Sequence, residues 1–231
     1  MSDNPQGVFI DDVEFPFDES SSILEFSNKS LGEKIIPTLC DDVNLKPYGA
    51  CRVCSVEVQH TEDGPKRTVA SCHTPISPGM RIYTNSDSVK TLRRNIVELV
   101  LSDHPPDCLT CEVNGNCELQ DVAASVGVRR IRYAKGENHC DREKDLSHAY
   151  MRMDLSKCIN CSRCVRACDE VQGQFTLTMT GRGFESRITT DNDMLFGDSS
   201  CVSCGACAQT CPTSAISDVF QSKSVEADKT V

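Results

Sequence analysis

The sequence predicts an α+β protein that is divided into small modules. β-rich segments occupy much of the first 71 residues, apolar residues recur at helical spacing from residue 89, and a cysteine-rich segment of eleven residues occurs twice in the last third of the chain. Only 5% of the 231 residues are aromatic and none is tryptophan, so side chains alone provide a limited core. Because sixteen residues are cysteine, bound metal could supply the missing stability.

The composition and the N-terminal stretch limit the classes to which the protein can belong. A net charge of -10 argues against binding to nucleic acid, which requires basic residues to neutralise phosphates. No apolar run approaches the length of a membrane span, so direct membrane insertion is not expected. The stretch MSDNPQGVFIDDVEF has neither a secretory signal nor a twin-arginine pair. We therefore expect a cytoplasmic protein whose thiols remain reduced.

The first elements expected along the chain are two strands and a helix. Residues 7–17 (GVFIDDVEFPF) predict two short strands around an Asp-Asp turn. Ser22 and Glu25 then fit a capping box ahead of an apolar segment. Gly32 lies where the C-terminal cap of the helix is expected, which completes a short and well-delimited helix.

Two more strands follow the helix after a long loop. They are predicted by the β-rich runs at 53–59 and 67–71, which the turn-prone sequence TEDGP separates. The order strand, strand, helix, loop and strands is typical of a β-grasp module. We expect this module to span residues 1–84.

A longer helix is predicted to open the next module. Pro105 requires this helix to stop near His104, because proline disfavours helical geometry in the residue before it. Residues 121–147 are charged and weakly patterned, which predicts a short helix followed by a loop. This gives a small helical module at residues 85–147. The apolar positions of its long helix are Val89, Leu92, Ile96, Val97 and Val100.

The repeat defines the third module. CINCSRCVRAC at 158–168 and CVSCGACAQTC at 201–211 align at all four cysteines with a constant offset of 43 residues. Each copy has the spacing C-x2-C-x2-C-x3-C, and the second continues into Pro212, which is the iron-sulfur pattern of bacterial ferredoxins. We expect a domain with two [4Fe-4S] clusters at residues 148–217, followed by a polar tail at 218–231.

The spacing of each copy predicts that ligation crosses between the copies. Three cysteines on a tight loop can surround one cluster, whereas the fourth, one helical turn further on, points toward the neighbouring cluster. Zinc is the alternative, but zinc sites usually combine two C-x2-4-C pairs across a longer loop. The predicted [4Fe-4S] ligand sets are Cys158, Cys161, Cys164 and Cys211, and Cys168, Cys201, Cys204 and Cys207.

The first module contains four cysteines with wider spacing. Spread ligands around a central C-x2-C are closer to 2Fe-2S binding of the plant type than to a cubane loop, although the spacing departs from the plant pattern. On spacing alone zinc is a serious rival. The β-grasp order and the repeat downstream favour a [2Fe-2S] cluster. The predicted ligands are Cys40, Cys51, Cys54 and Cys72.

The second module has three cysteines where four are usual for a cluster. An isolated histidine at a helix end more often interacts with the last carbonyl groups of the helix. Here, Pro105 and Pro106 stiffen the spacer that follows His104. If His104 is a ligand, fifteen cysteines and one histidine complete four sites and leave Cys140 as a free thiol. The predicted [4Fe-4S] set is His104, Cys108, Cys111 and Cys117.

The other candidate residues have simpler interpretations. We expect His60, His73, His139 and His148 on the surface, and the charges of RRIR (129–132) facing solvent or a partner. No nucleotide-binding glycine motif and no nucleophile paired with a base is apparent. The chain is therefore expected to be an electron-transfer component without a substrate site of its own.

The ordered motifs resemble a known region of several related redox proteins. Between about residues 7 and 217, they are similar to the N-terminal iron-sulfur region of the complex I large iron-sulfur subunit. The same region occurs in NAD-dependent formate dehydrogenases, in [FeFe]-hydrogenases and in the diaphorase iron-sulfur subunit of NAD-linked [NiFe]-hydrogenases. The resemblance implies that His104 is a cluster ligand, and that the region conducts electrons between a flavin and NAD(P)-binding subunit and a separate catalytic subunit.

The local motifs favour one catalytic partner. GRGFESRI (181–188) and SCVSCGACAQTCPTSAI (200–216) look most like formate dehydrogenases. A chain of this length instead resembles the diaphorase-type subunit of a hydrogenase, in which electron bifurcation is possible. Two other functions stay open: a zinc-binding interaction scaffold and a free ferredoxin-like carrier. With one [2Fe-2S] and three [4Fe-4S] clusters, the expected iron content is about 14 atoms per chain.

Overall fold

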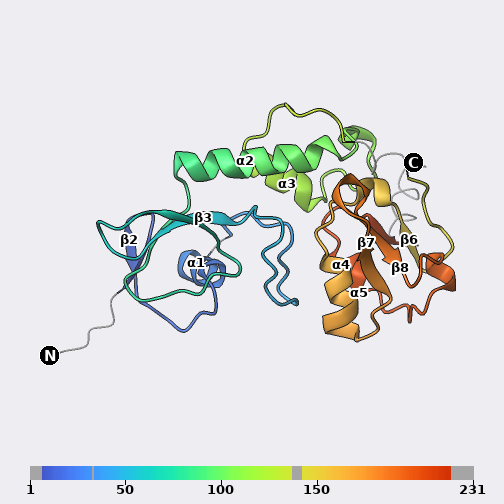
Figure 1. Ribbon diagram of the computed structural model, residues 1–231, viewed down its shortest axis with the longest axis horizontal. Helices are drawn as coiled ribbons and strands as arrows, with labels where there is room; N and C mark the ends of the chain where they lie inside the picture. Colours follow the sequence, from blue (N-terminus) through green and yellow to red (C-terminus); the bar gives the residue numbers. More distant parts are fainter. Residues whose placement is uncertain (1–6, 33, 137–141, 220–231) are drawn as a thin grey trace, which may run out of the picture.

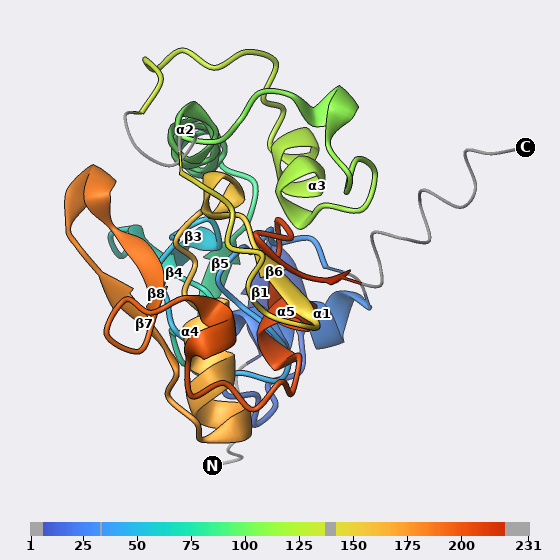
Figure 2. The same ribbon diagram turned by 90° about the vertical axis from the view of Figure 1, so that its right-hand side faces the viewer.

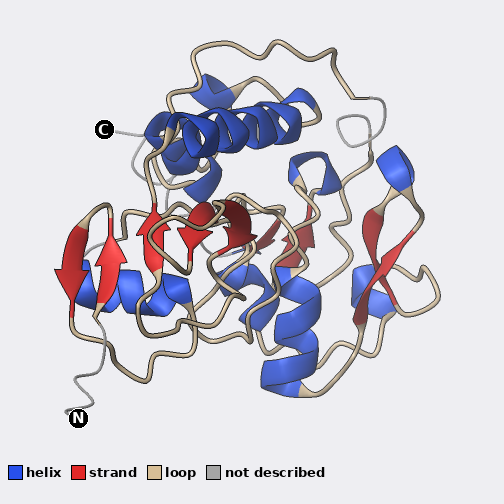
Figure 3. Ribbon diagram, turned by 60° about the vertical axis from the view of Figure 1, so that its left-hand side comes forward, coloured by secondary structure: helices blue, strands red, loops and turns tan. Residues whose placement is uncertain are grey.

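The computed structural model describes residues 7–32, 34–136 and 142–219. A mixed sheet lies at one end of the molecule and a cysteine-rich part lies at the other, as seen in Figure 1. A long helix runs above both ends and connects them. Loops join many short helices and strands, so that much of the chain is irregular (Figure 3).

The sheet at the N-terminal end has five strands in the order β2-β1-β5-β3-β4. Only β1 and β5 run parallel, and every other neighbouring pair is antiparallel. The strands around the Asp-Asp turn and those flanking TEDGP confirm the sequence predictions, whereas the central strand β5 was not predicted. The strands are β1 (Val8–Ile10), β2 (Val13–Phe15), β3 (Ser55–Gln59), β4 (Arg67–Ala70) and β5 (Arg81–Tyr83).

Helix α1 (Ile23–Leu31) packs its apolar face on this sheet and confirms the predicted caps. Ser22 Oγ accepts the Glu25 N–H at 3.2 Å, and Gly32 closes the helix with a φ of 69°. The Glu25 carboxylate accepts the N–H of Ser21 at 2.7 Å, one residue earlier than in a standard capping box. Both ends of the helix are therefore fixed by local sequence.

Helix α2 (Asp87–Ser102) ends just before His104, as Pro105 predicts. Arg93, which is 4% exposed, anchors the helix to the sheet by donating to the carbonyl groups of Ser55 and Thr84, both at 3.0 Å. Helix α3 (Glu118–Ser125) lies next to α2, and together they cover one side of the molecule (Figure 2). Within the described residues, no helix is long and apolar enough to cross a membrane.

The C-terminal part contains two small antiparallel sheets, β6-β9 and β7-β8, with the repeat between them. Each copy of the repeat curls through two left-handed residues at equivalent positions, Asn160 and Ser162 in the first and Ser203 and Gly205 in the second, and then enters a short helix. The same backbone path thus occurs twice. The elements are β6 (Met151–Met153), α4 (Arg163–Arg166), a π-helical turn η4 (Ala167–Gln172), β7 (Leu177–Thr180), β8 (Arg187–Thr190), α5 (Ala206–Thr210) and β9 (Ile216–Asp218).

Single 3-10 turns complete the described structure: η1 (Cys108–Thr110), η3 (Leu155–Lys157), η5 (Gly183–Glu185) and η6 (Phe196–Asp198). Most of the predicted polar tail, from residue 220 onward, lies outside the described residues. Cys140 and His139 lie outside them as well.

Candidate metal centres

The four widely spaced cysteines of the first part come together beside the sheet. Cys51 and Cys54 lie just before β3, Cys72 lies just after β4, and Cys40 belongs to the long loop after α1. The sulfur atoms of Cys54 and Cys72 are 3.3 Å apart. Strand pairing between β3 and β4 explains this contact, because it brings residues 18 positions apart to the same edge.

Neighbouring thiols and backbone N–H groups favour the thiolate form at two of these positions. The Cys51 thiol and the N–H groups of Cys51 and Ala50 lower the pKa of Cys40 to about 6. The Cys72 thiol, opposed by burial, lowers the pKa of Cys54 to about 6. Thiolates are the form of cysteine that binds metal. The environment of this set is therefore suited to ligation.

The second set lines the largest cavity among the described residues. His104, Cys108, Cys111 and Cys117 all face a cavity of about 520 Å³ between the end of α2 and the start of α3. Its other walls come from Leu119 and from Arg129, Arg130 and Lys157. His104 is half-buried, and burial raises the pKa of Cys117. The structure thus brings the histidine and the three cysteines to one space.

The repeat forms two separate cavities, and each is lined by cysteines from both copies. One is lined by the first three cysteines of copy one and the last of copy two; the other shows the reverse arrangement. The crossed grouping predicted from the spacing is therefore the grouping that the fold brings together. The sets are Cys158, Cys161, Cys164 and Cys211, and Cys168, Cys201, Cys204 and Cys207.

Burial controls the protonation of the thiols in these two cavities. It raises the pKa of Cys158 to about 11 and those of Cys161 and Cys207 to about 12, and it raises the pKa of Cys164 well above its usual value. Neighbouring cysteines add to the shift at each site. A bound cationic metal reverses this preference, because it stabilises the thiolate directly.

The donor sets fit iron-sulfur clusters. Three sets consist of thiols only and the fourth replaces one thiol by imidazole, which are the ligands that such clusters use. In the described parts of the chain, no three His, Cys, Asp or Glu residues are grouped so that they could hold a single metal ion. A set arranged around a cavity matches a polynuclear group, whose separate metal atoms each take one protein ligand.

His148 corrects one sequence prediction. It was expected on the surface but is 8% exposed, because its ring packs against Phe196 at a centroid distance of 4.8 Å. Its Nδ1 accepts the N–H groups of Tyr150 and Met151, both at 3.1 Å. The nearest polar neighbour of Nε2 is the Ser203 hydroxyl at 3.2 Å, on a cysteine-bearing loop. No pattern in the sequence indicates this contact.

The remaining surface predictions hold where the structure describes them. His60 and His73 are exposed. Arg129 and Arg130 are also exposed, and in addition they line the cavity of the histidine-containing set. Their charge lies near the site, which the sequence interpretation did not anticipate.

Three protein-family profiles match the chain in consecutive segments. A 2Fe-2S iron-sulfur cluster binding domain matches residues 7–87. The NADH-ubiquinone oxidoreductase-G iron-sulfur binding region matches residues 93–132. A 4Fe-4S dicluster domain matches residues 157–215. The chain therefore contains 2Fe-2S and 4Fe-4S binding domains.

Individual relatives agree with these profiles. The chain is 41% identical over 204 residues to the NADP-reducing hydrogenase subunit HndD of Solidesulfovibrio fructosivorans, which covers 86% of this chain and 33% of that protein. It is 32% identical over 210 residues to the G 2 subunit of NADH-quinone oxidoreductase from Rhizobium meliloti, with 90% and 23% coverage. The chain thus spans a third or less of the length of these two relatives.

A solved structure is similar over almost the whole chain. The crystal structure of an NAD+-reducing [NiFe]-hydrogenase in the H2-reduced state superimposes with a TM-score of 0.81 and 29% sequence identity. The match covers 93% of this chain and 87% of the matched chain. The fold described above is therefore shared with one chain of that enzyme.

Proposed function

This chain has the iron-sulfur region that is shared by the large iron-sulfur subunit of NADH-quinone oxidoreductase and by hydrogenase subunits that reduce NAD(P), and from this premise we propose that it is an electron-transfer subunit. It relays electrons between a flavin and NAD(P)-binding subunit and a separate catalytic subunit. One observation carries the proposal: one chain brings together four sets of cluster ligands, three of which line their own cavities.

The proposed contents are one [2Fe-2S] and three [4Fe-4S] clusters. When bound, such clusters supply one-electron oxidation and reduction. The protein provides the thiolate and imidazole ligands, excludes water by burial, and directs N–H groups at sulfur, for example from Asn160 to Cys158 at 3.4 Å. His104 carries no negative charge when it acts as a ligand, so its set is expected to have the higher potential that imidazole ligation gives.

For the catalytic partner we propose the hydrogenase type first. The NADP-reducing and NAD+-reducing hydrogenases among the relatives support it. The formate dehydrogenase type was expected from residues 181–188 and 200–216, but the relatives described above lend it no specific support. It remains the second candidate on those motifs alone. The need for free thiols also supports a reducing compartment, such as the cytoplasm.

Iron and acid-labile sulfide analysis of the anaerobically purified chain tests the electron-transfer proposal. We expect a brown protein with about 14 iron atoms per chain and EPR signals of both cluster types after reduction. A colourless protein that contains zinc would instead support the interaction scaffold. Identification of the chains that co-purify from the native source, together with their nickel, molybdenum or tungsten content, distinguishes the hydrogenase from the formate dehydrogenase type. A monomer without partners would support the free carrier.

A further inference from the structure

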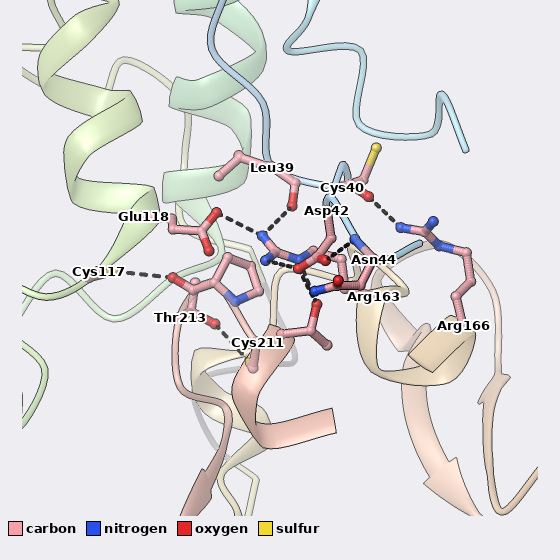
Figure 4. Close-up of polar contacts among 12 residues, drawn as sticks. Leu39, Cys40, Asp42, Asn44, Cys117, Glu118, Arg163, Arg166, Cys211 and Thr213 are labelled. Atoms are coloured by element: carbon pink, nitrogen blue, oxygen red, sulfur yellow. Dashed lines mark hydrogen bonds and ion pairs between the residues drawn. The ribbon is translucent and has the colours of Figure 1, made fainter. Parts of the chain in front are cut away.

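A buried arginine joins segments from all three parts of the molecule. Arg163 is the first residue of α4, and its side chain is 5% exposed. Its Nε donates to the Thr210 hydroxyl at 3.1 Å, its Nη2 to Asp42 Oδ2 at 2.8 Å, and its Nη1 to Glu118 Oε2 at 2.7 Å. Figure 4 shows the guanidinium between the loop that bears Asp42 and the helix that begins with Glu118.

The network around this guanidinium is closed. The Thr210 hydroxyl also donates to Asp42 Oδ2 at 2.8 Å, and the Asn44 N–H donates to Asp42 Oδ1 at 2.9 Å. Asp42 is nearly buried, with 12% of its side chain exposed, whereas Glu118 is half-exposed at 49%. Removing Arg163 therefore leaves a nearly buried carboxylate without its cation, which is costly.

A second arginine on the same helix extends the contact. Arg166 donates through Nη1 to the Lys46 carbonyl at 2.6 Å and through Nη2 to the Cys40 carbonyl. Its guanidinium also lies over the Tyr48 ring, 4.8 Å from the centroid. Helix α4 thus holds the loop of the N-terminal set at several points.

These contacts occur next to predicted ligands of three different sets. Arg163 and each of the three side chains bonded to it lie within two positions of such a cysteine, so a shift of one residue moves a ligand loop. The pairs are Asp42 with Cys40, Glu118 with Cys117, Arg163 with Cys164, and Thr210 with Cys211.

We propose that Arg163 is a positioning residue that fixes the distances between the N-terminal set, the histidine-containing set and the set around Cys164. This inference rests on the proposed function, because it requires clusters in those sets. Electron transfer falls steeply with the distance between redox centres, so a contact that fixes these distances controls the rate of relay. A lysine would provide the charge but not the several directed donors that reach Thr210, Asp42 and Glu118 together.

The test compares Arg163→Gln with a matched control, Arg187→Gln, in the full chain. Arg187 also pairs with a carboxylate, Asp193, at 2.6 Å, but this contact stays within the C-terminal part. For each protein, iron and sulfide content are measured first. The electron spin relaxation of the reduced [2Fe-2S] signal then reports its proximity to reduced [4Fe-4S] clusters. We expect R163Q to retain the wild-type iron content while the relaxation slows severalfold, and R187Q to match the wild type.

The outcomes separate this inference from the proposed function. A wild-type chain without iron-sulfur signals overturns both. A wild-type chain with clusters, together with an R163Q variant of unchanged iron content and unchanged relaxation, overturns only the positioning role of Arg163. If R163Q loses iron, Glu118→Gln decides, because this half-exposed side chain provides only one of the contacts. Slower relaxation in an iron-replete E118Q supports the proposal, and unchanged relaxation overturns it.

Discussion

The imidazole Nε2 of His148 lies 3.2 Å from the hydroxyl oxygen of Ser203. Nδ1 accepts two backbone N–H groups, so the ring proton resides on Nε2 and donates to Ser203. Ser203 in turn donates its N–H to Cys201 Sγ at 3.4 Å. A buried histidine thus supports the loop that holds three cysteines of the second repeat copy, although it is not itself a proposed ligand.

Replacement of His148 by phenylalanine should alter one cluster selectively. The variant keeps a ring beside Phe196 but loses the bond to Ser203, which loosens the N–H to sulfur bond at Cys201. Because hydrogen bonds to sulfur raise cluster potentials, we expect the potential of that single cluster to fall. An EPR-monitored redox titration measures the change, with the other clusters as internal controls. Equal shifts in all clusters, or none, would contradict a local role.

Crossed ligation predicts which cysteine variants lose the same cluster. Cys211→Ala should remove the same [4Fe-4S] signal as Cys158→Ala, because both residues line one cavity. Cys168→Ala should remove the same signal as Cys201→Ala, since these residues line the other. Iron content and reduced EPR spectra of the four variants check the pairing. If Cys168→Ala instead matched Cys158→Ala, ligation would stay within each copy.

The sequence predicts well those features that are encoded locally. Ser22 and Gly32 fix the ends of α1, Pro105 ends α2, and the spacing of the repeat anticipates the grouping of its cysteines around two cavities. Each of these depends on residues close in sequence or on an exact repeat. The geometry of the turns and helices involved leaves little choice.

Features that depend on distant contacts were missed. Strand β5 has only three residues, and its parallel pairing with β1 follows from the way the whole sheet closes. His148 is buried because Phe196, 48 positions away, covers its ring. The network of Arg163 joins residues 45 to 121 positions apart. No local period or cap signals such contacts.

The N-cap of α1 should contribute measurably to the stability of the N-terminal part. Ser22→Ala removes the acceptor for the Glu25 N–H and should lower the free energy of unfolding by about 1 kcal/mol. Ser22→Gly serves as the matched control, because glycine at an N-cap costs only a few tenths of a kcal/mol. Urea denaturation followed by circular dichroism measures both. Equal stability of wild type and S22A would show that the cap is dispensable.

A ligand role for His104 predicts the effect of His104→Cys. A thiolate in place of a neutral imidazole adds negative charge to the cluster, so its potential should become more negative while the iron content is unchanged. Redox titration measures this potential, and His73→Cys, at an exposed position, is the control. If His104 does not bind iron, H104C and H73C should behave alike.

The thiol pKa values predict that cluster assembly responds differently to pH at different sites. Cys40 and Cys54 have pKa values lowered to about 6, so both are thiolates above that pH and become protonated as the pH falls through it. Cys158 and Cys161 have pKa values raised to about 11 and 12, so both stay protonated up to that range and must release protons when they bind iron. Each released proton makes binding tighter as the pH rises. Reconstitution of the apoprotein with iron and sulfide between about pH 7 and pH 8.5 should therefore increase [4Fe-4S] content more than [2Fe-2S] content. Quantitative EPR of the two signals measures this ratio, and a ratio independent of pH would contradict the proposed protonation states.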